Sequence, residues 1–297
     1  METRNATEKA LSSFCDVSAI SNHLSEKDKA RLHRISTEFS KEAVKVEEAG
    51  LKVLGVEVSQ GIVRNYLFCL LTANAVKHVN KKGMHPTILE MGMGSGLNAV
   101  AALTMDPQAR YIGVELNDVC IRFASREFIK RGFAKQVEII KGSYQYIRLK
   151  KKADIIINEN LGPHLVEEPQ MLAARAALRF AKKDALFVPS GARLYALLNG
   201  KRKDIRKINF RRVPPSSISF SMRLSRRTEF RPGYDIVDFQ GNAIMQKNPN
   251  NFIPHLPLIG EPMTLQQKGK KAVKVTLDFK GRRIAVENSV LVSEKLK

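Results

Sequence analysis

The chain has 297 residues, enough for one large domain or two ordinary ones, and 43% of them are hydrophobic. This composition excludes a disordered protein, and no apolar run reaches the ~18–20 residues that a membrane span needs. The three cysteines are scattered without a CxxC pair, which argues against a disulfide framework and a zinc site. The first residues lack the apolar core of a secretory signal. We therefore expect a cytoplasmic protein with no metal site and no membrane contact.

The formal net charge is +21, from 50 Lys and Arg against 29 Asp and Glu. Residues 201–231 carry much of the excess, with eleven basic and two acidic residues. Such a charge predicts attraction to polyanions, including nucleic acid. A general basic bias that only aids solubility is an equally good interpretation.

Two helices come first in the chain, an amphipathic one over 25–48 and a more apolar one over 61–80. Short apolar runs then alternate with helical stretches. The predicted strands are 87–92, 111–117, 137–142, 153–159 and 185–199, and the predicted helices are 97–105, 119–132 and 168–182. This alternation predicts an α/β fold with a parallel, doubly wound, Rossmann-like sheet.

After residue 199 the pattern changes to short alternating strands separated by proline- and glycine-rich turns. These strands are predicted at 217–224, 234–239, 271–279 and 283–292. They favour an antiparallel, β-barrel-like domain. We expect an N-terminal helical segment (1–85), a doubly wound domain (86–189) and a β-rich substrate domain (190–297).

The sequence ILEMGMGSGLNAVAAL joins the first predicted strand to a helix and contains Gly92, Gly94 and Gly96. Such glycines let the backbone turn tightly and approach a ligand, and a dinucleotide is one candidate. The spacing E-x-G-x-G-x-G favours S-adenosylmethionine instead. Glu115 ends the next strand, where its carboxylate can accept hydrogen bonds from both ribose hydroxyls. Glu90 would lie near the amino-acid end of this cofactor.

An acidic residue after the third strand addresses adenine in many methyltransferases. The corresponding loop here reads KGSYQY and has no carboxylate. Tyr144 and Gln145 are the candidates for that contact, through a backbone N–H and a side-chain amide.

Glu159 and Glu168 follow the fourth strand and bracket a loop with a Gly-Pro pair. Two carboxylates that face one pocket repel each other unless a cation lies between them. A guanidinium satisfies such a pair, because its planar donors bond two carboxylates at once. Glu167 is the alternative second carboxylate, and two solvated surface acids are the simplest interpretation.

At this loop the chain resembles the protein arginine methyltransferases. NENLGPHLVEE keeps both glutamates at that family's spacing, and FVPSGARLYA, EPMTLQQKG and VTLDFKG resemble its later segments. The resemblance implies a methyltransferase sheet followed by a β-barrel, S-adenosylmethionine as donor and a guanidino nitrogen of a protein, peptide or small molecule as acceptor. It also implies a homodimer.

Several positions depart from that family. Asn160 replaces the tryptophan after the first glutamate, and only His255 matches the later Thr-His-Trp loop. Arg64 is the candidate for the family's carboxylate-binding arginine. The family's helical dimerisation arm has no obvious counterpart in 200–232.

These residues suit methyl transfer to a guanidinium. Glu159 and Glu168 would hold its charge on one side, and His255 would take the released proton. The basic surface repels the cationic proteins such enzymes often use. Two alternatives therefore stay open: a nucleic-acid methyltransferase, and a non-catalytic scaffold or activator subunit.

Overall fold

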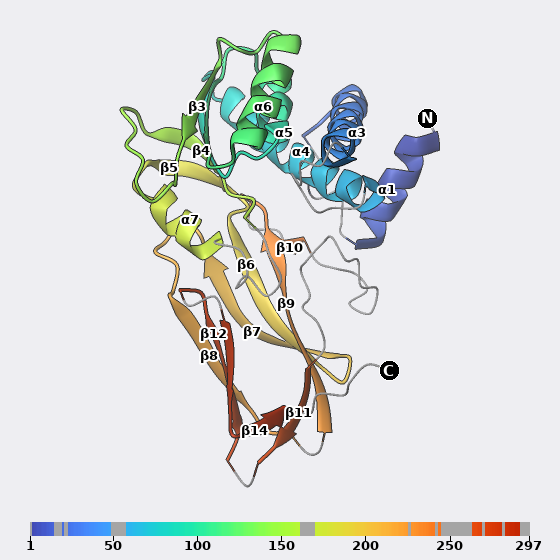
Figure 1. Ribbon diagram of the computed structural model, residues 1–297, viewed down its shortest axis with the longest axis vertical. Coiled ribbons are helices and arrows are strands. Elements are labelled where there is room, and N and C mark those ends of the chain that lie inside the picture. The colour runs from blue at the N-terminus through green and yellow to red at the C-terminus, as the bar shows by residue number, and fades with distance from the viewer. Residues whose placement is uncertain are drawn as a thin grey trace.

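A computed structural model describes residues 2–14, 20, 23–48, 58–160, 170–224, 227–240, 243–244, 263–268, 271–280 and 283–291. Helices and a parallel sheet form the upper half of the molecule in Figure 1, and antiparallel strands form the lower half. None of the described helices is long and apolar enough to cross a membrane. The described residues also contain no cluster of side chains that could hold a metal ion.

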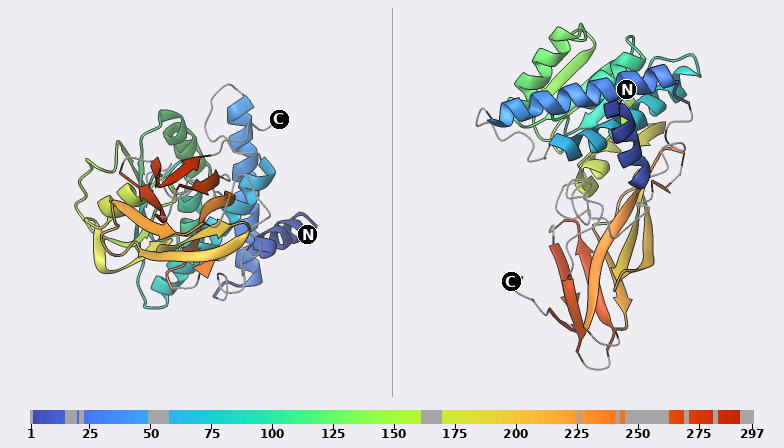
Figure 2. Two further views of the ribbon diagram at one scale, coloured as in Figure 1. Left: turned by 90° about the horizontal axis from the view of Figure 1, so that it is seen from below. Right: turned by 90° about the vertical axis from the view of Figure 1, so that its right-hand side faces the viewer.

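Three helices precede the sheet: α1 (Glu2–Phe14), α3 (Glu26–Glu48) and α4 (Val58–Asn80). The structure confirms the predicted helices at 25–48 and 61–80 as α3 and α4, whereas α1 has no counterpart among the predicted elements. The middle of α4 is buried, and α3 lies across it and across α5 (Leu97–Met105), as Figure 2 shows. The apolar composition of α4 follows from this coverage.

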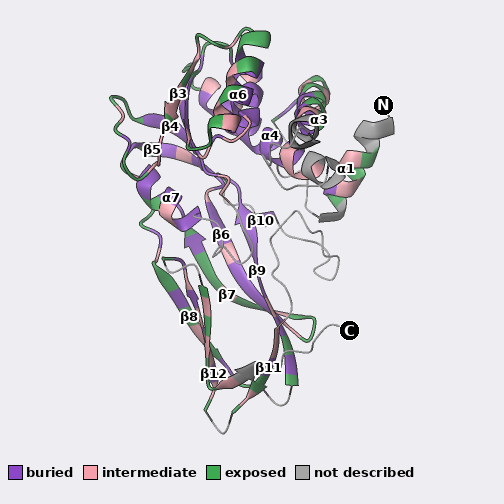
Figure 3. Cartoon of the chain, viewed as in Figure 1, coloured by how far each residue is buried: buried purple, intermediate pink, exposed green. Residues whose placement is uncertain are grey.

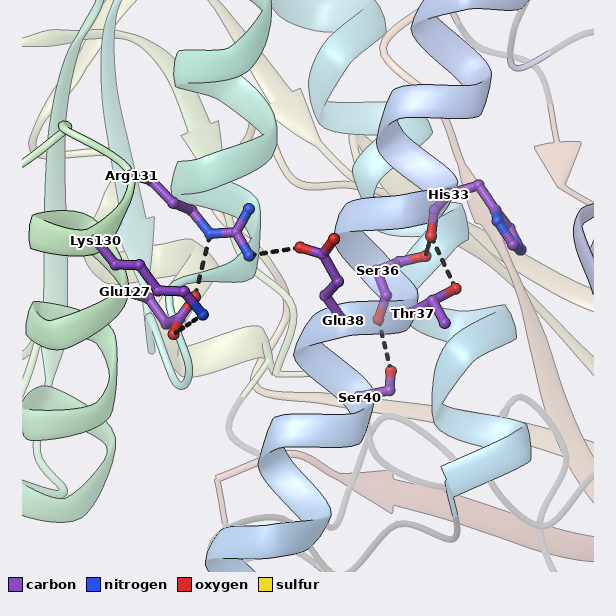
Figure 4. A network of polar contacts seen from close by, with 8 residues as sticks. All are labelled: His33, Ser36, Thr37, Glu38, Ser40, Glu127, Lys130 and Arg131. Atoms are coloured by element: carbon purple, nitrogen blue, oxygen red, sulfur yellow. Dashed lines mark hydrogen bonds and ion pairs between the residues drawn. The ribbon is translucent and has the colours of Figure 1, made fainter.

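An ion pair of Arg131, the residue after α6 (Asp118–Lys130), joins α3 to α6, and Figure 4 shows it from close by. The Arg131 guanidinium donates to the Glu38 carboxylate at 2.9 Å and to the Glu127 carboxylate at 3.1 Å. On the buried face of α3, the Ser36 and Ser40 hydroxyls donate to backbone carbonyls one turn earlier. The Arg131–Glu38 pair joins α3 to the helical layer of the sheet, and the bonds within α3 pair its two buried hydroxyls.

The central sheet has the strand order β3-β2-β1-β4-β5, and every neighbouring pair is parallel. Its strands are β1 (Thr87–Met91), β2 (Arg110–Glu115), β3 (Val137–Lys141), β4 (Ala153–Ile157) and β5 (Ala181–Val188). The predicted doubly wound sheet is therefore confirmed. The strand order reverses at β1, and ligands bind sheets of this kind beyond the carboxyl ends of the strands at such a point.

The last helix of this half is shorter than predicted. α7 spans Gln170–Ala177, whereas the pattern predicted a helix over 168–182. The prediction is wrong at the C-terminal end because β5 already begins at Ala181 and pairs with Ala153 of β4.

A proline separates the two halves of the molecule. β5 ends before Pro189, which follows a cis peptide bond, and β6 spans Gly191–Leu198. The stretch 185–199, where the pattern predicted strand again, contains the end of β5 and the whole of β6, and the ladder is interrupted at Pro189 because a prolyl nitrogen has no hydrogen to donate. The Ser190 amide instead donates to the carbonyl of Val237 and begins a new pairing.

Two antiparallel sheets form the second half, which confirms the predicted β-rich domain. One has the order β14-β11-β9-β6-β7 with β10 beside β9, and the other has the order β13-β12-β8. The strands after β6 are β7 (Lys201–Asn209), β8 (Ser217–Met222), β9 (Arg227–Val237), β10 (Ala243–Ile244), β11 (Met263–Gln267), β12 (Val273–Asp278), β13 (Arg283–Glu287) and β14 (Ser289–Leu291). Phe230, Leu265 and Val275 belong to the core that the two sheets share.

Candidate active site

The loop after β1 is built from the three predicted glycines. Gly92, Gly94 and Gly96 have φ angles of +81°, +56° and +78°, which residues with side chains rarely adopt. A Cβ atom at Gly94 would meet no atom within 4 Å. At Gly96 it would lie 2.6 Å from the Phe128 ring. The backbone at Gly94 is therefore open to a ligand, while Gly96 is required by packing.

Glu115, the predicted ribose-binding residue, ends β2 beside this loop. Its Oε2 accepts a hydrogen bond from the Gly94 amide at 2.7 Å. Its Oε1 accepts from the amides of Leu116 and Asn117 at 2.8 and 2.7 Å. The carboxylate is thus held by the backbone at the carboxyl ends of β1 and β2, where the predicted cofactor would bind.

Glu90, on β1, is buried with an exposed fraction of 1%. The Tyr111 hydroxyl donates to its Oε2 at 2.6 Å, and the Asn98 amide donates to its Oε1 at 2.7 Å. Burial raises the pKa of Glu90 to about 8, despite these two hydrogen bonds, and the charges of Glu159 and Glu115 add to the effect. Near neutral pH the Glu90 carboxyl is therefore largely protonated, which lowers the negative charge of the site.

Glu159, the first of the two predicted clamp glutamates, follows the end of β4 next to β1. Its Oε1 accepts a hydrogen bond from Arg64 Nε of α4 at 2.7 Å. Both side chains are about one-fifth exposed, at 19% and 20%. Within the described chain no hydrogen bond reaches Oε2 of Glu159. Arg64, predicted as a ligand of the cofactor carboxylate, has a protein carboxylate as its partner here.

Two asparagines flank Glu159 and attach it to β1. The Asn160 amide donates to the Met91 carbonyl at 2.6 Å and to Asn158 Oδ1 at 2.7 Å. The Asn158 amide in turn donates to the Gln170 carbonyl at the start of α7. Asn160, which stands where the protein arginine methyltransferases have a tryptophan, is therefore bonded to β1 and, through Asn158, to α7.

Tyr144 and Gln145, the predicted adenine contacts, lie in the loop after β3, on the same edge of the sheet as Glu115. Their backbone carbonyls each accept a hydrogen bond from Arg179 Nη2 at 3.0 Å. Tyr144 is half-buried and Gln145 is exposed. Their proposed contact with adenine stays a prediction.

Glu168, its alternative Glu167 and His255 lie outside the described residues. The contacts of Asn98 and Tyr111 with Glu90 could not be predicted from the sequence, because Asn98 lies on α5 and Tyr111 on β2, apart from β1. Burial, and after it the charges of Glu159 and Glu90, raise the pKa of the Cys69 thiol on α4. A polar residue in an otherwise apolar helix, such as α5, is the signal that could have identified Asn98.

Comparisons with known proteins indicate the type of domain and the fold. A family model described as "Methyltransferase domain" matches residues 88–184. An uncharacterized protein of Methanocaldococcus jannaschii is 26% identical over 133 residues, which are 44% of this chain and 49% of that protein. A bifunctional methyltransferase of Rickettsia typhi is 25% identical over 158 residues, which are 53% of this chain and 29% of that protein. The chain thus spans half or less of these curated relatives.

Two solved structures share the fold over both halves of the chain. The PRMT1 enzyme–prozyme heterotetrameric complex of Trypanosoma brucei with AdoHcy has a TM-score of 0.56 at 15% identity and covers 77% of this chain and 90% of its own. Protein arginine methyltransferase 10 of Arabidopsis thaliana has a TM-score of 0.50 at 14% identity and covers 75% and 94%.

The chain carries a class I methyltransferase domain within the fold of the protein arginine methyltransferases. This domain implies S-adenosylmethionine as the methyl donor. The residues present fit that molecule, because the backbone at Gly94 is open and a carboxylate, Glu115, stands beside it at the end of β2.

Proposed function

We propose that the protein is an S-adenosylmethionine-dependent N-methyltransferase that acts on a guanidino nitrogen of arginine type. The acceptor belongs to a protein, a peptide or a small molecule. The observation that carries this proposal is the state of Glu159: one carboxylate oxygen is anchored on the Arg64 guanidinium, and the other is not hydrogen-bonded within the described chain. The free oxygen can accept a hydrogen bond from a second guanidinium.

The position of Glu159 supports this role. It follows β4, the neighbour of β1, and Asn160 next to it is bonded to the last residue of β1. The acceptor carboxylate and the glycine-rich loop thus share one edge of the sheet. S-adenosylmethionine supplies a methyl group attached to a positively charged sulfur, so the acceptor nitrogen has to be aligned beside that edge.

Glu159 contributes orientation and charge. A guanidinium is a weak nucleophile because its charge is delocalised and its pKa exceeds 12. A carboxylate bonded to one side holds the positive charge there and leaves electron density on the opposite nitrogen. Glu168, or Glu167, would be the second carboxylate. As the N–CH₃ bond forms, that nitrogen loses a proton, for which His255 is the proposed acceptor.

Glu159→Gln tests the proposal, because it removes the charge and keeps the shape. We expect turnover on arginine-containing acceptors to fall by about 100-fold or more, with cofactor affinity by calorimetry nearly unchanged. Glu138→Gln is the matched control, since Glu138 is an exposed carboxylate on β3 that pairs with Arg110. Unchanged turnover in Glu159→Gln would contradict the proposal. If the wild-type protein binds no S-adenosylmethionine, the scaffold alternative is correct.

A further inference from the structure

β7 is an edge strand with an unusual set of side chains. It pairs with β6 on one side, and no other strand in the described part of the chain pairs with its second edge. Figure 3 shows most of its length as exposed. The exposed residues are Lys201, Lys203, Asp204, Arg206, Lys207 and Asn209.

Two acidic side chains near β7, those of Asp204 and Asp235, both accept hydrogen bonds from Arg202. Arg202 donates to buried Asp235 at 2.7 Å and to Asp204 at 2.8 Å, and its guanidinium lies 4.0 Å from the centre of the Tyr195 ring. The other cations of the strand have no ion pair with any described residue, and the same holds in the loop that follows. These residues are Lys201, Lys203, Arg206, Lys207, Arg211 and Arg212. We call them the β7 cation strip.

The strip leads to the candidate active site. β7 is antiparallel to β6, so Asn209 at its end lies opposite Gly191 at the start of β6. That start directly follows β5, whose Val188 lies opposite Ile157, two residues before Glu159. Beyond β7, the carbonyl of Pro214 is bonded by Arg175 of α7. The strip therefore starts beside the site and runs away from it for about 30 Å, at ~3.3 Å per residue.

We propose that the β7 cation strip binds an extended acidic segment of a polypeptide substrate and so delivers an arginine in that polypeptide to Glu159. This inference rests on the proposed function and names its substrate class. The free edge of β7 offers backbone N–H and C=O groups to an added strand. Lysines on such an edge repel basic strands and disfavour neutral ones, because pairing would desolvate their charges, whereas an acidic strand neutralises them.

The aromatic residues near the strip favour a peptide over a nucleic acid. Single-stranded nucleic acids stack their bases on exposed aromatic rings beside a basic groove. Phe210 and Phe230 are buried, and Phe220 is partly buried. No large aromatic side chain of the described strands is available as a stacking platform beside the strip.

Fluorescence anisotropy with labelled peptides of about 12 residues, long enough to follow the strand, tests the proposal. The probes are a Glu/Asp-rich peptide with one arginine, a neutral peptide, an Arg/Gly-rich peptide and an oligouridine RNA. We expect the acidic peptide to bind at least tenfold more tightly than the other three at low salt. Tighter binding of the RNA, or equal binding of the neutral peptide, would overturn the proposal.

Charge reversal locates the contact. Lys203→Glu with Arg206→Glu should weaken binding of the acidic peptide at least tenfold. Lys150→Glu with Lys151→Glu changes the net charge equally, at exposed residues before the opposite end of β4, and should weaken it far less. Equal losses in the two double variants would show only general electrostatic attraction and would refute the strip.

Two further measurements separate strand addition from the proposed chemistry. Acidic peptides N-methylated at alternate amides, in the two possible registers, should differ in affinity, because only one register of N–H groups faces β7. Equal affinity contradicts pairing with the strand.

Methylation of free arginine should be unchanged in Lys203→Glu with Arg206→Glu. If the wild-type protein binds the acidic peptide but methylates no arginine, the proposed function fails and binding of the peptide to the β7 cation strip stands. If arginine is methylated while the strip variant binds the peptide normally, only the proposed binding to the strip fails.

Discussion

The acidic residues of the candidate active site and the basic residues of β7 differ in how their charges are compensated. Glu90, Glu115 and Glu159 each accept hydrogen bonds from neighbouring protein groups, and Glu90 is largely neutral near pH 7. Most cations of β7 have no described ionic partner and face solvent. Holding several carboxylates together at the active site opposes folding, but it orients these groups before a ligand binds. The second arrangement, that of the β7 cations, is inexpensive and suits an external partner of opposite charge.

Within β7 itself, Arg202 follows the first pattern and its neighbour Lys203 the second. Asp235 has an exposed fraction of 0%, and its ion pair with Arg202 is shielded by the Tyr195 ring. Removal of one partner from a buried ion pair leaves the other charge without compensation. The contrast between these adjacent residues can therefore be tested by stability.

Among substitutions compared at one pH, the largest loss of stability is expected for Asp235→Ala. We predict that it lowers the free energy of unfolding by about 3 kcal/mol, as measured by urea titration. Lys203→Ala is the matched control and should change stability by less than about 0.5 kcal/mol. Similar values for the two variants would mean that the buried pair and the exposed cation do not differ in the way the structure indicates.

Glu90→Gln tests whether the Glu90 carboxyl is neutral near pH 7, unlike an ordinary glutamate. Because burial raises the pKa of Glu90 from its ordinary 4.5 to about 8, the folded state binds this proton more tightly than the unfolded state does. The stabilisation is complete below pH 4.5 and is lost as the pH rises towards 8, at about 1.4 kcal/mol per pH unit. In Glu90→Gln, urea titrations between pH 5 and 8 should lack this component of the slope. An identical slope in both proteins would mean that Glu90 titrates normally.

The features that the sequence could predict are those that depend on neighbouring residues in the chain. The central sheet, the glycine-rich loop and the position of Glu115 follow from local patterns, because apolar runs and glycine spacing are determined over a few neighbouring residues. The Arg64–Glu159 pair joins positions 95 residues apart, and no local spacing encodes it. β7 has no alternating apolar pattern, since it is an edge strand whose charged side chains face solvent on both sides. The proposed domain limits and site roles stay predictions.

The smallest effect is expected at the contact between the glycine-rich loop and the segment that contains Glu159. A Cβ atom at Gly92 would lie 2.8 Å from Asn160 Oδ1, at a φ of +81°. Gly92→Ala should therefore cost about 1–2 kcal/mol from the backbone conformation alone, with an added steric term, and should weaken cofactor binding. Asn160→Ala removes the clashing atom, and also the hydrogen bond to Met91. If the clash is real, the stability loss of the double variant is smaller than the sum of the single losses by more than about 0.5 kcal/mol. Additive losses would mean that the glycine-rich loop and the Glu159 segment respond independently, and that Asn160 does not connect them.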